Sequence, residues 1–512
     1  MGIDGTIPRM LLVLAATLCT PSHLEGSVTA AGGDYVDIAF EVPANTAEIR
    51  IAHTDASDVV ILDWGVWSPS GFRGWGGGLT EDIVIGVDQS SRGYLPGAIE
   101  PGTWTLVIGK ALLAADGGRY VVDIACSDAQ TLPVLPKAPF SPVVMSSERR
   151  WYKGDFHVHS SQSGDSGATL DENVQLAHTR GLDFINLSDH NTISQHALVA
   201  AQQPSWPVLV LRSSEITTYS GHGNGVGIHD YVDHRLGYRG RTAADIVDDV
   251  VAQGGMFIVN HPALELGNAC IGCAWKHIDD LPWDKVSGLE VLTAGYLIAE
   301  GSYTPKVIEM WDMLEDQGHR LSAVGGSDDH TAGRNEGATG AAVGSPTPVV
   351  LASELSEAAI IDAVRHQHTQ VLLRGPDDPF VDAKLRKRDG TLADIGDDID
   401  GISRVELPVH VAGATTMFLE LWRNGAKIQE VPVTSDDFST VLHDEPGPGD
   451  VRYRVELTNA GARRIVVTSH FYVHAVAGSG GGCSTGGGSP GVLLAALAGW
   501  VARRRRRSTL SS

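Results

Sequence analysis

Basic residues are scarce in this sequence of 512 residues, and its N-terminal apolar run is short. The chain has 38 lysines and arginines against 62 aspartates and glutamates, a formal net charge of −24. A surface that follows the phosphates of duplex DNA needs clustered lysine and arginine, so this composition excludes a broad duplex-binding face. Small anions remain compatible with the chain if metal ions supply the positive charge.

The N-terminus resembles a secretion signal. Arg9 precedes the apolar run "MLLVLAATLCT" (Met10 to Thr20), which is too short to span a bilayer as one helix. Its length and position predict a signal peptide over residues 1–26, with a buried helix as the alternative. We therefore expect an exported protein.

The C-terminal segment, residues 477–512, has three parts in order. A Gly-rich spacer carries Cys483, a short apolar stretch runs from Val492 to Ala502, and the five arginines Arg503 to Arg507 follow. This order predicts a short membrane segment with transient membrane contact. It resembles the Cys-containing sorting signals of myxobacterial surface proteins, which implies removal by a sorting protease and a final place at the cell envelope or surface, or secretion.

Cysteines are few, and only three lie away from these terminal segments. They are Cys126 and the pair Cys270 and Cys273 in "NACIGCAW", since Cys19 and Cys483 lie in or beside the ends. In an exported protein the C-x-x-C pair favours a local disulfide that clips a loop. A metal site and two free thiols are the alternatives.

Three regions differ in their pattern, and no internal repeat is found. Residues 28–130 alternate apolar and polar positions between Gly, Pro and Asp breaks, which predicts an N-terminal β-sandwich. A Pro-rich linker follows. Residues 146–380 alternate short β-branched runs with helical stretches, which predicts βα units and a parallel sheet or barrel. Residues 381–476 return to strands and predict a second, immunoglobulin-like β-sandwich.

Histidines concentrate in the βα region. Twelve of the 20 lie between His157 and His330, and several follow predicted strands. The carboxyl ends of parallel strands meet at one mouth, where ligand-binding groups collect. Other histidines of this region, among them His234, are assigned to surface or capped positions.

The stretch "GDFHVHSSQSGDSG", Gly154 to Gly167, allows two interpretations. Ser166 in "GDSG" resembles a protease nucleophile, whereas His157 and His159 alternate with apolar residues and share one strand face, where they can bind one ion. The following "ATLDENVQLAHTRG" is helical, unlike the strand expected after a protease loop. We therefore interpret Asp165 as a carboxylate facing metal ions and Ser166 as a helix cap.

Six motifs then carry a family resemblance: "DFHVHSSQSGDSG", "INLSDHN", "SSEITT", "GHGNGVGI", "VNHP" and "GGSDDH". In this order they are similar to PHP-domain metallohydrolases of the polymerase and histidinol phosphatase superfamily. Within that superfamily they resemble the CehA/McbA type, which also carries a front β-sandwich. The resemblance implies a multidomain protein with a distorted (β/α)7 PHP barrel between its two sandwiches.

The resemblance also implies two to three divalent metal ions, with Glu215 bridging two of them. Imidazole and carboxylate ligands without thiolate suit Mn, Zn or Fe, and Asp189 is expected to orient a ligand imidazole. Glu215, Asp328 and His261 are the expected catalytic residues. The implied ligands are His157, His159, Glu215 and Asp328 for one ion, Glu215, His222 and His261 for the second, and Asp165, His190 and His330 for the third.

The expected chemistry is hydrolysis by a metal-bound hydroxide. The first hypothesis is a phosphoesterase acting on small phosphate esters, nucleotides or the 5′ ends of short oligonucleotides, as a 5′–3′ exonuclease would. The second is a carbamate, ester or amide hydrolase, because CehA-like relatives include carbamate-cleaving enzymes. The third is a non-catalytic surface binding protein. Arg212 and Arg334 are expected near the mouth, either gripping an anion or forming surface salt bridges.

Overall fold

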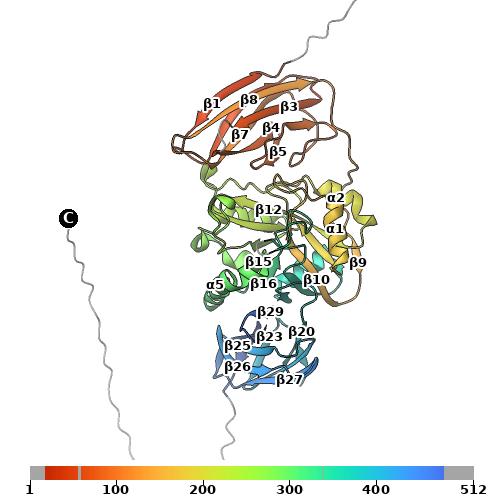
Figure 1. Ribbon diagram of the computed structural model, residues 1–512, viewed down its shortest axis with the longest axis vertical. Helices are drawn as coiled ribbons and strands as arrows, with labels where there is room; N and C mark the ends of the chain where they lie inside the picture. Colours follow the sequence, from red (N-terminus) through yellow and green to blue (C-terminus); the bar gives the residue numbers. More distant parts are fainter. Residues whose placement is uncertain (1–17, 56–58, 338–339, 478–512) are drawn as a thin grey trace, which may run out of the picture. The chain divides into compact units, whose positions relative to one another are not determined.

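The computed structural model describes residues 18–55, 59–337 and 340–477, and the described residues up to Val476 form one compact unit (Figure 1). Most of the expected signal peptide and nearly all of the C-terminal segment, including its apolar stretch and arginines, lie outside the described residues. None of the helices in the described part of the chain combines the length and apolar character needed to cross a bilayer.

The N-terminal region is a β-sandwich of two four-stranded antiparallel sheets, drawn in red to orange in Figure 1. Buried apolar side chains of both sheets, including Trp64 and Trp104, form one core between them. One sheet contains β1 (His23–Val28), β8 (Gly118–Ser127), β3 (Glu48–Asp55) and β6 (Ile83–Gly86). The other contains β2 (Tyr35–Val42), β7 (Gly102–Leu112), β4 (Ile61–Ser68) and β5 (Gly71–Gly76).

This sandwich begins earlier than the sequence suggested. Cys19 forms a disulfide with Cys126, and Thr20 exchanges two backbone hydrogen bonds with Glu41. Strand β1 then pairs with β8 from residue 23 onwards. The expected boundary at residue 26 is therefore too late, because residues 18–26 are part of the folded sandwich.

The middle region alternates strands and helices. Strands β10, β11 and β12 are parallel neighbours, as are β14, β15 and β16, and the antiparallel β13 lies between the two groups. The strands are β10 (Arg150–Val158), β11 (Phe184–Leu187), β12 (Leu209–Thr218), β13 (Gly221–Val226), β14 (Met256–Val259), β15 (Val286–Thr293) and β16 (Ser322–Gly326). The helices are α1 (Leu170–Thr179), α2 (His196–Gln202), α3 (Ala243–Ala252), α4 (Tyr296–Ser302), α5 (Thr304–Asp316) and α6 (Glu357–Arg365).

A closed barrel is not confirmed, because the strands form an open hydrogen-bonded order from β16 to β10 and then onward to β17 (Thr347–Ala352) and β19 (Thr369–Leu372). The carboxyl ends of β10 and β16 nevertheless meet. The backbone N–H of Asp328 donates to His157 O at 2.8 Å, and that of His159 donates to Asp329 O at 3.0 Å. These bonds bring the segments that follow the two strands side by side.

The C-terminal region continues the same sheet. Strand β19 pairs with β29 (Arg464–Thr468), so hydrogen bonding crosses the boundary expected at residue 380. A second sheet, β20–β24–β27, covers a core of buried apolar residues. The remaining strands are β9 (Val144–Ser146), β18 (Leu355–Ser356), β20 (Val381–Ala383), β21 (Leu385–Arg386), β22 (Leu392–Ala393), β23 (Asp398–Ile402), β24 (Val405–Ala412), β25 (Phe418–Arg423), β26 (Ala426–Pro432), β27 (Asp437–Asp444), β28 (Gly449–Thr458) and β30 (Phe471–Ala475).

Candidate metal centre

All nine residues that the sequence suggested as ligands lie at one place, around the carboxyl ends of the middle strands. Eight of them form overlapping groups whose nitrogen and oxygen atoms lie within 4.8 Å of one another, and Asp165 contacts two of the eight. The groups are His157, His159 and Glu215; His157, His261 and Asp328; Glu215, His222 and His261; and His159, His190 and His330.

Glu215 lies at the middle of these groups. Its Oε1 is 3.2 Å from His261 Nε2 and 3.4 Å from both His157 Nε2 and His222 Nδ1. Its Oε2 is 2.8 Å from His190 Nδ1. Burial alone would raise the pKa of Glu215, but the imidazoles of His157 and His190 outweigh burial and hold that pKa well below its usual range. A charged carboxylate thus has imidazoles on several sides, the arrangement of a bridging ligand.

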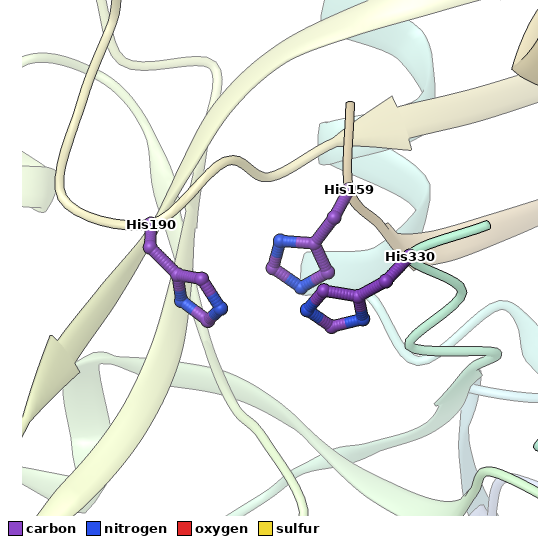
Figure 2. A group of neighbouring side chains, drawn as sticks. All are labelled: His159, His190 and His330. Atoms are coloured by element: carbon purple, nitrogen blue, oxygen red, sulfur yellow. The ribbon is translucent and has the colours of Figure 1, made fainter. Parts of the chain in front are cut away.

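His159 belongs to two of the groups, whereas the resemblance assigned it to one. Figure 2 shows its ring between those of His190 and His330, which come from separate segments, with centroid distances of 4.3 and 4.0 Å. Burial, reinforced by these two imidazoles, lowers the pKa of His159 to about 3, so that its ring is neutral, the form that binds metals. Asp165 Oδ2 lies 3.3 Å from His190 Nε2 and 3.2 Å from His330 Nε2.

The chemistry of the donor set fits divalent ions. His157 Nε2 and His159 Nε2 lie 3.0 Å apart, and Asp328 Oδ1 is within 3.3 Å of both. Nitrogen and carboxylate atoms that converge in this way suit divalent metal ions. Two ligand residues, His261 with φ of 27° and Asp328 with φ of 55°, also have left-handed backbone conformations, a strain that proteins concentrate at functional sites.

Glu290 is a positioning residue that the sequence did not single out. It lies fully buried in β15, where its Oε1 accepts a hydrogen bond from His157 Nδ1 at 2.9 Å and its Oε2 accepts one from the His261 backbone N–H at 2.9 Å. This leaves His157 Nε2 facing the other ligands. A Cβ at Gly326 would lie 2.2 Å from His157 Cβ, so glycine is needed there. The only sequence signal was an acidic residue inside the apolar run "GLEVLT".

The loop that contains the C-x-x-C pair orients two more ligands. Its cysteines form a local disulfide, the favoured alternative for this pair, so neither offers a thiolate to a metal ion. His222 Nε2 donates to the carbonyl of Ile271 at 3.0 Å, and His261 Nδ1 donates to the carbonyl of Cys273 at 3.2 Å. The opposite ring nitrogen of each histidine faces Glu215. His222 itself lies on β13, which forms a hairpin with β12.

Two expected roles are wrong. Asp189 does not contact an imidazole; it accepts hydrogen bonds from Ser160 and from the backbone N–H of Ser163, whose hydroxyl contacts His159 Nδ1 at 3.2 Å. Ser166 does not cap α1, because Thr169 does so. The Ser166 hydroxyl donates to the backbone carbonyl of His330 and is not bonded to any imidazole in the described chain, so it lacks the base that a nucleophile needs.

A pocket of about 410 Å³ opens onto the centre, and the N-terminal sandwich forms one of its walls through residues that include Ile61, Asp63 and Trp75. The sandwich is held against the middle region by aromatic contacts and by Tyr219, whose hydroxyl donates to Asp63 at 2.7 Å. His234, expected at the surface, is buried in this interface with its ring 4.4 Å from that of Trp75. The sandwich is thus part of the site.

Comparisons with known proteins give distant similarities. No family model matches the chain. A segment of 120 residues, 22% of the chain, is 25% identical to an uncharacterized protein of Methanocaldococcus jannaschii and covers 67% of it. A Bacteroides vulgatus two-domain protein containing a predicted PHP-like metal-dependent phosphoesterase is 18% identical, with a TM-score of 0.37, over 67% of this chain and 99% of that one. A Bifidobacterium adolescentis protein assigned to the metal-dependent phosphoesterases is 14% identical, with a TM-score of 0.26, over 36% and 90%.

Proposed function

We propose that this protein is a metal-dependent hydrolase of the PHP type, of the CehA/McbA branch, and that it acts as a phosphoesterase on small phosphate esters. The observation that carries the proposal is the position of Glu215, a buried carboxylate with imidazoles of three ligand groups around it. Two or three divalent ions held there would supply an activated water and would stabilise charge on the leaving oxygen.

The side chains of the protein have distinct roles in this proposal. Glu215 joins the ligand groups, and Asn260 fixes its orientation by donating to Oε1 at 2.9 Å. Asp328 Oδ1 lies 3.3 Å from His157 Nε2 and 3.1 Å from His159 Nε2, and would hold an ion together with them. Asp165, whose side chain is about half exposed, and His330 lie at the mouth, where the phosphoryl group would enter. Their place beside the pocket makes them the groups nearest to an incoming substrate.

A second candidate, carbamate or ester hydrolysis, is favoured by the apolar part of the pocket wall, which includes Trp75 and Leu264. Neutral substrates need fewer charged contacts than nucleotides do. A purely binding role is disfavoured because the complete donor set is present and gathered in one place.

We also infer that the protein is exported. Its two disulfides, Cys19–Cys126 and Cys270–Cys273, favour an oxidising compartment. Removal of the C-terminal segment by a sorting protease remains part of this proposal.

The test is turnover by purified protein reconstituted with Mn or Zn, with a nitrophenyl phosphate and a naphthyl carbamate as substrates. We expect metal-dependent cleavage of the phosphate ester. His190→Ala and His330→Ala should each lower kcat by on the order of a hundredfold, since charge stabilisation is lost. Ser166→Ala should change kcat by no more than about a few-fold. Cleavage of the carbamate alone would replace the first candidate with the second, and no metal-dependent turnover of either substrate would remove both.

A further inference from the structure

We infer that the pocket selects esters that carry a single anionic group, the one that reacts at the metal centre, joined to a small, uncharged and largely apolar leaving group. This inference rests on the proposed hydrolase function and narrows its substrate class. It disfavours bisphosphates and oligonucleotides, which carry further phosphates away from the scissile bond.

The first observation concerns lysine and arginine. Among the described residues, no lysine or arginine lines the pocket. The arginines expected near the mouth have other partners: Arg212 forms a 2.6 Å ion pair with Glu357, and Arg334 forms a 3.0 Å pair with Glu172. Metal ions at the centre can neutralise one phosphoryl group, but a second anion beyond their reach would lose its hydration without gaining a cation.

The second observation is a fixed carboxylate in the pocket wall. Asp63 of β4 lines the pocket opposite the middle region, where its Oδ1 accepts the backbone N–H of Gly78 and its Oδ2 accepts the hydroxyl of Tyr219, both at 2.7 Å. These bonds are among the contacts that hold the carboxylate in place. A second anionic group on the substrate would lie near this negative charge. The pocket wall therefore disfavours such substrates by repulsion, in addition to offering them no lysine or arginine among its described residues.

The third observation is the apolar surface beside the centre. Ile61 and Trp75 from the sandwich, and Leu264, Leu266 and Ile271 from the loop that precedes and includes the disulfide, line the same pocket. Together with a volume of about 410 Å³, this lining suits one compact apolar group. Burial of such a group against these side chains would supply binding free energy that a charged group cannot obtain there.

The matched substrates for the test are 4-carbamoylphenyl phosphate and 4-carboxyphenyl phosphate, which have nearly the same shape and differ by one negative charge. With the Mn- or Zn-loaded protein, we expect kcat/KM to be at least about tenfold higher for the carbamoyl compound, mainly through KM. Equal efficiency, or a preference for the carboxyl compound, would overturn the inference while leaving the hydrolase function in place.

Two variants test the cause of the preference. Asp63→Asn removes the repelling charge and should reduce the preference by several-fold. Asn268→Arg adds a cation at the exposed rim of the pocket and should raise kcat/KM for the carboxyl compound alone. Ala426→Arg, an equal charge change at an exposed position in β26, is the control and should leave the ratio unchanged. If neither pocket variant changes the ratio, the electrostatic explanation is wrong.

Binding of two non-hydrolysable analogues, 4-carbamoylbenzylphosphonate and 4-carboxybenzylphosphonate, measured by calorimetry on the metal-loaded protein, gives a readout that needs no turnover, and both analogues carry a phosphonate for the metal centre. We expect the carbamoyl analogue to bind more tightly than the carboxyl analogue by at least about tenfold. Tighter binding of the carboxyl analogue would contradict the inference. If neither phosphate ester is cleaved, the proposed function fails, and this binding pair still decides the preference of the pocket.

Discussion

A single buried carboxylate, Glu290, fixes two ligand residues at once. It accepts one hydrogen bond from the ring of His157 and one from the backbone of His261, the residue with the left-handed conformation. The first bond determines which nitrogen of His157 faces the centre, and the second supports the strained backbone. Partners of this kind typically change metal affinity by tenfold to a hundredfold when they are removed.

We expect Glu290→Ala to weaken metal binding by about tenfold or more, measured by competition with a chelator. Glu290→Gln should have a smaller effect, because its amide oxygen still accepts the hydrogen bond from His157, whereas its NH₂ group cannot accept one from His261. Unchanged affinity in folded Glu290→Ala protein would show that the position has no orienting role.

Among single residues, the sequence pointed to the nine candidate ligands because each belongs to a short motif that lies in a strand or follows one. It did not point to Glu290 or Asn260, because their partners are far away in the chain and only the fold brings them together. It also misplaced Ser166 and Asp189. Both have several plausible neighbours in sequence, and the choice among them depends on how the loop from His159 to Ala168 turns back on itself.

Among the elements, the β12–β13 hairpin and the disulfide loop 270–273 act together. The hairpin carries Glu215 and His222, and the carbonyls of the loop hold the rings of His222 and His261 from the opposite side. The disulfide joins cysteines with two residues between them, which limits the positions that these carbonyls can adopt. The loop is therefore a support for the second group of ligands.

Replacing this disulfide, as Cys270→Ser with Cys273→Ser, should weaken the binding of the ion nearest to His222 and His261 by about tenfold, because the rings lose their orientation. Metal titration of the variant measures this directly. The matched control is Cys19→Ser with Cys126→Ser, which removes the other disulfide, away from the centre, and should lower thermal stability without changing the metal affinity of the folded protein. Equal metal affinities in both double variants would contradict the role of the loop.

Across the whole molecule, the middle region is continuous with the C-terminal region. Besides the β19–β29 pairing, a buried guanidinium joins them: Arg454 of β28 is fully buried and donates to Asp312 of α5 at 2.6 Å and to Glu456 at 2.8 Å. Removing one partner of a buried ion pair leaves buried charge with less compensation; without Arg454, Asp312 would keep Arg452 at 3.3 Å and Glu456 would keep Arg464 at 2.7 Å.

We therefore expect Arg454→Ala to lower the free energy of unfolding by about 3–5 kcal/mol, measured by urea denaturation. Arg404→Ala, which changes an exposed arginine of the same region, should stay within about 0.5 kcal/mol of the unsubstituted protein. A similar, small effect of both substitutions would show that the two regions are stabilised independently.

The three regions could be predicted because each has its own pattern of apolar residues. The contacts between distant parts of the chain could not. The pairing of β19 with β29, the Cys19–Cys126 disulfide and the contribution of β4 to the pocket all join residues distant in sequence. Alternation of apolar residues shows that a strand has a buried face; it does not show which strand lies beside it. The closed barrel was expected from the family resemblance, and the local patterns could not test it, since they do not show whether a sheet closes.

The central claim is that the cluster around Glu215 binds divalent metal ions. Its most direct test is anomalous X-ray diffraction from crystals of the Mn- or Zn-loaded protein, recorded on both sides of the absorption edge of the metal. The account predicts at least two anomalous peaks in contact with the cluster, one of them within coordination distance of both Glu215 and His261, and the loss of that peak in Glu215→Ala crystals. Crystals of fully loaded protein with no anomalous peak near Glu215 would contradict the account.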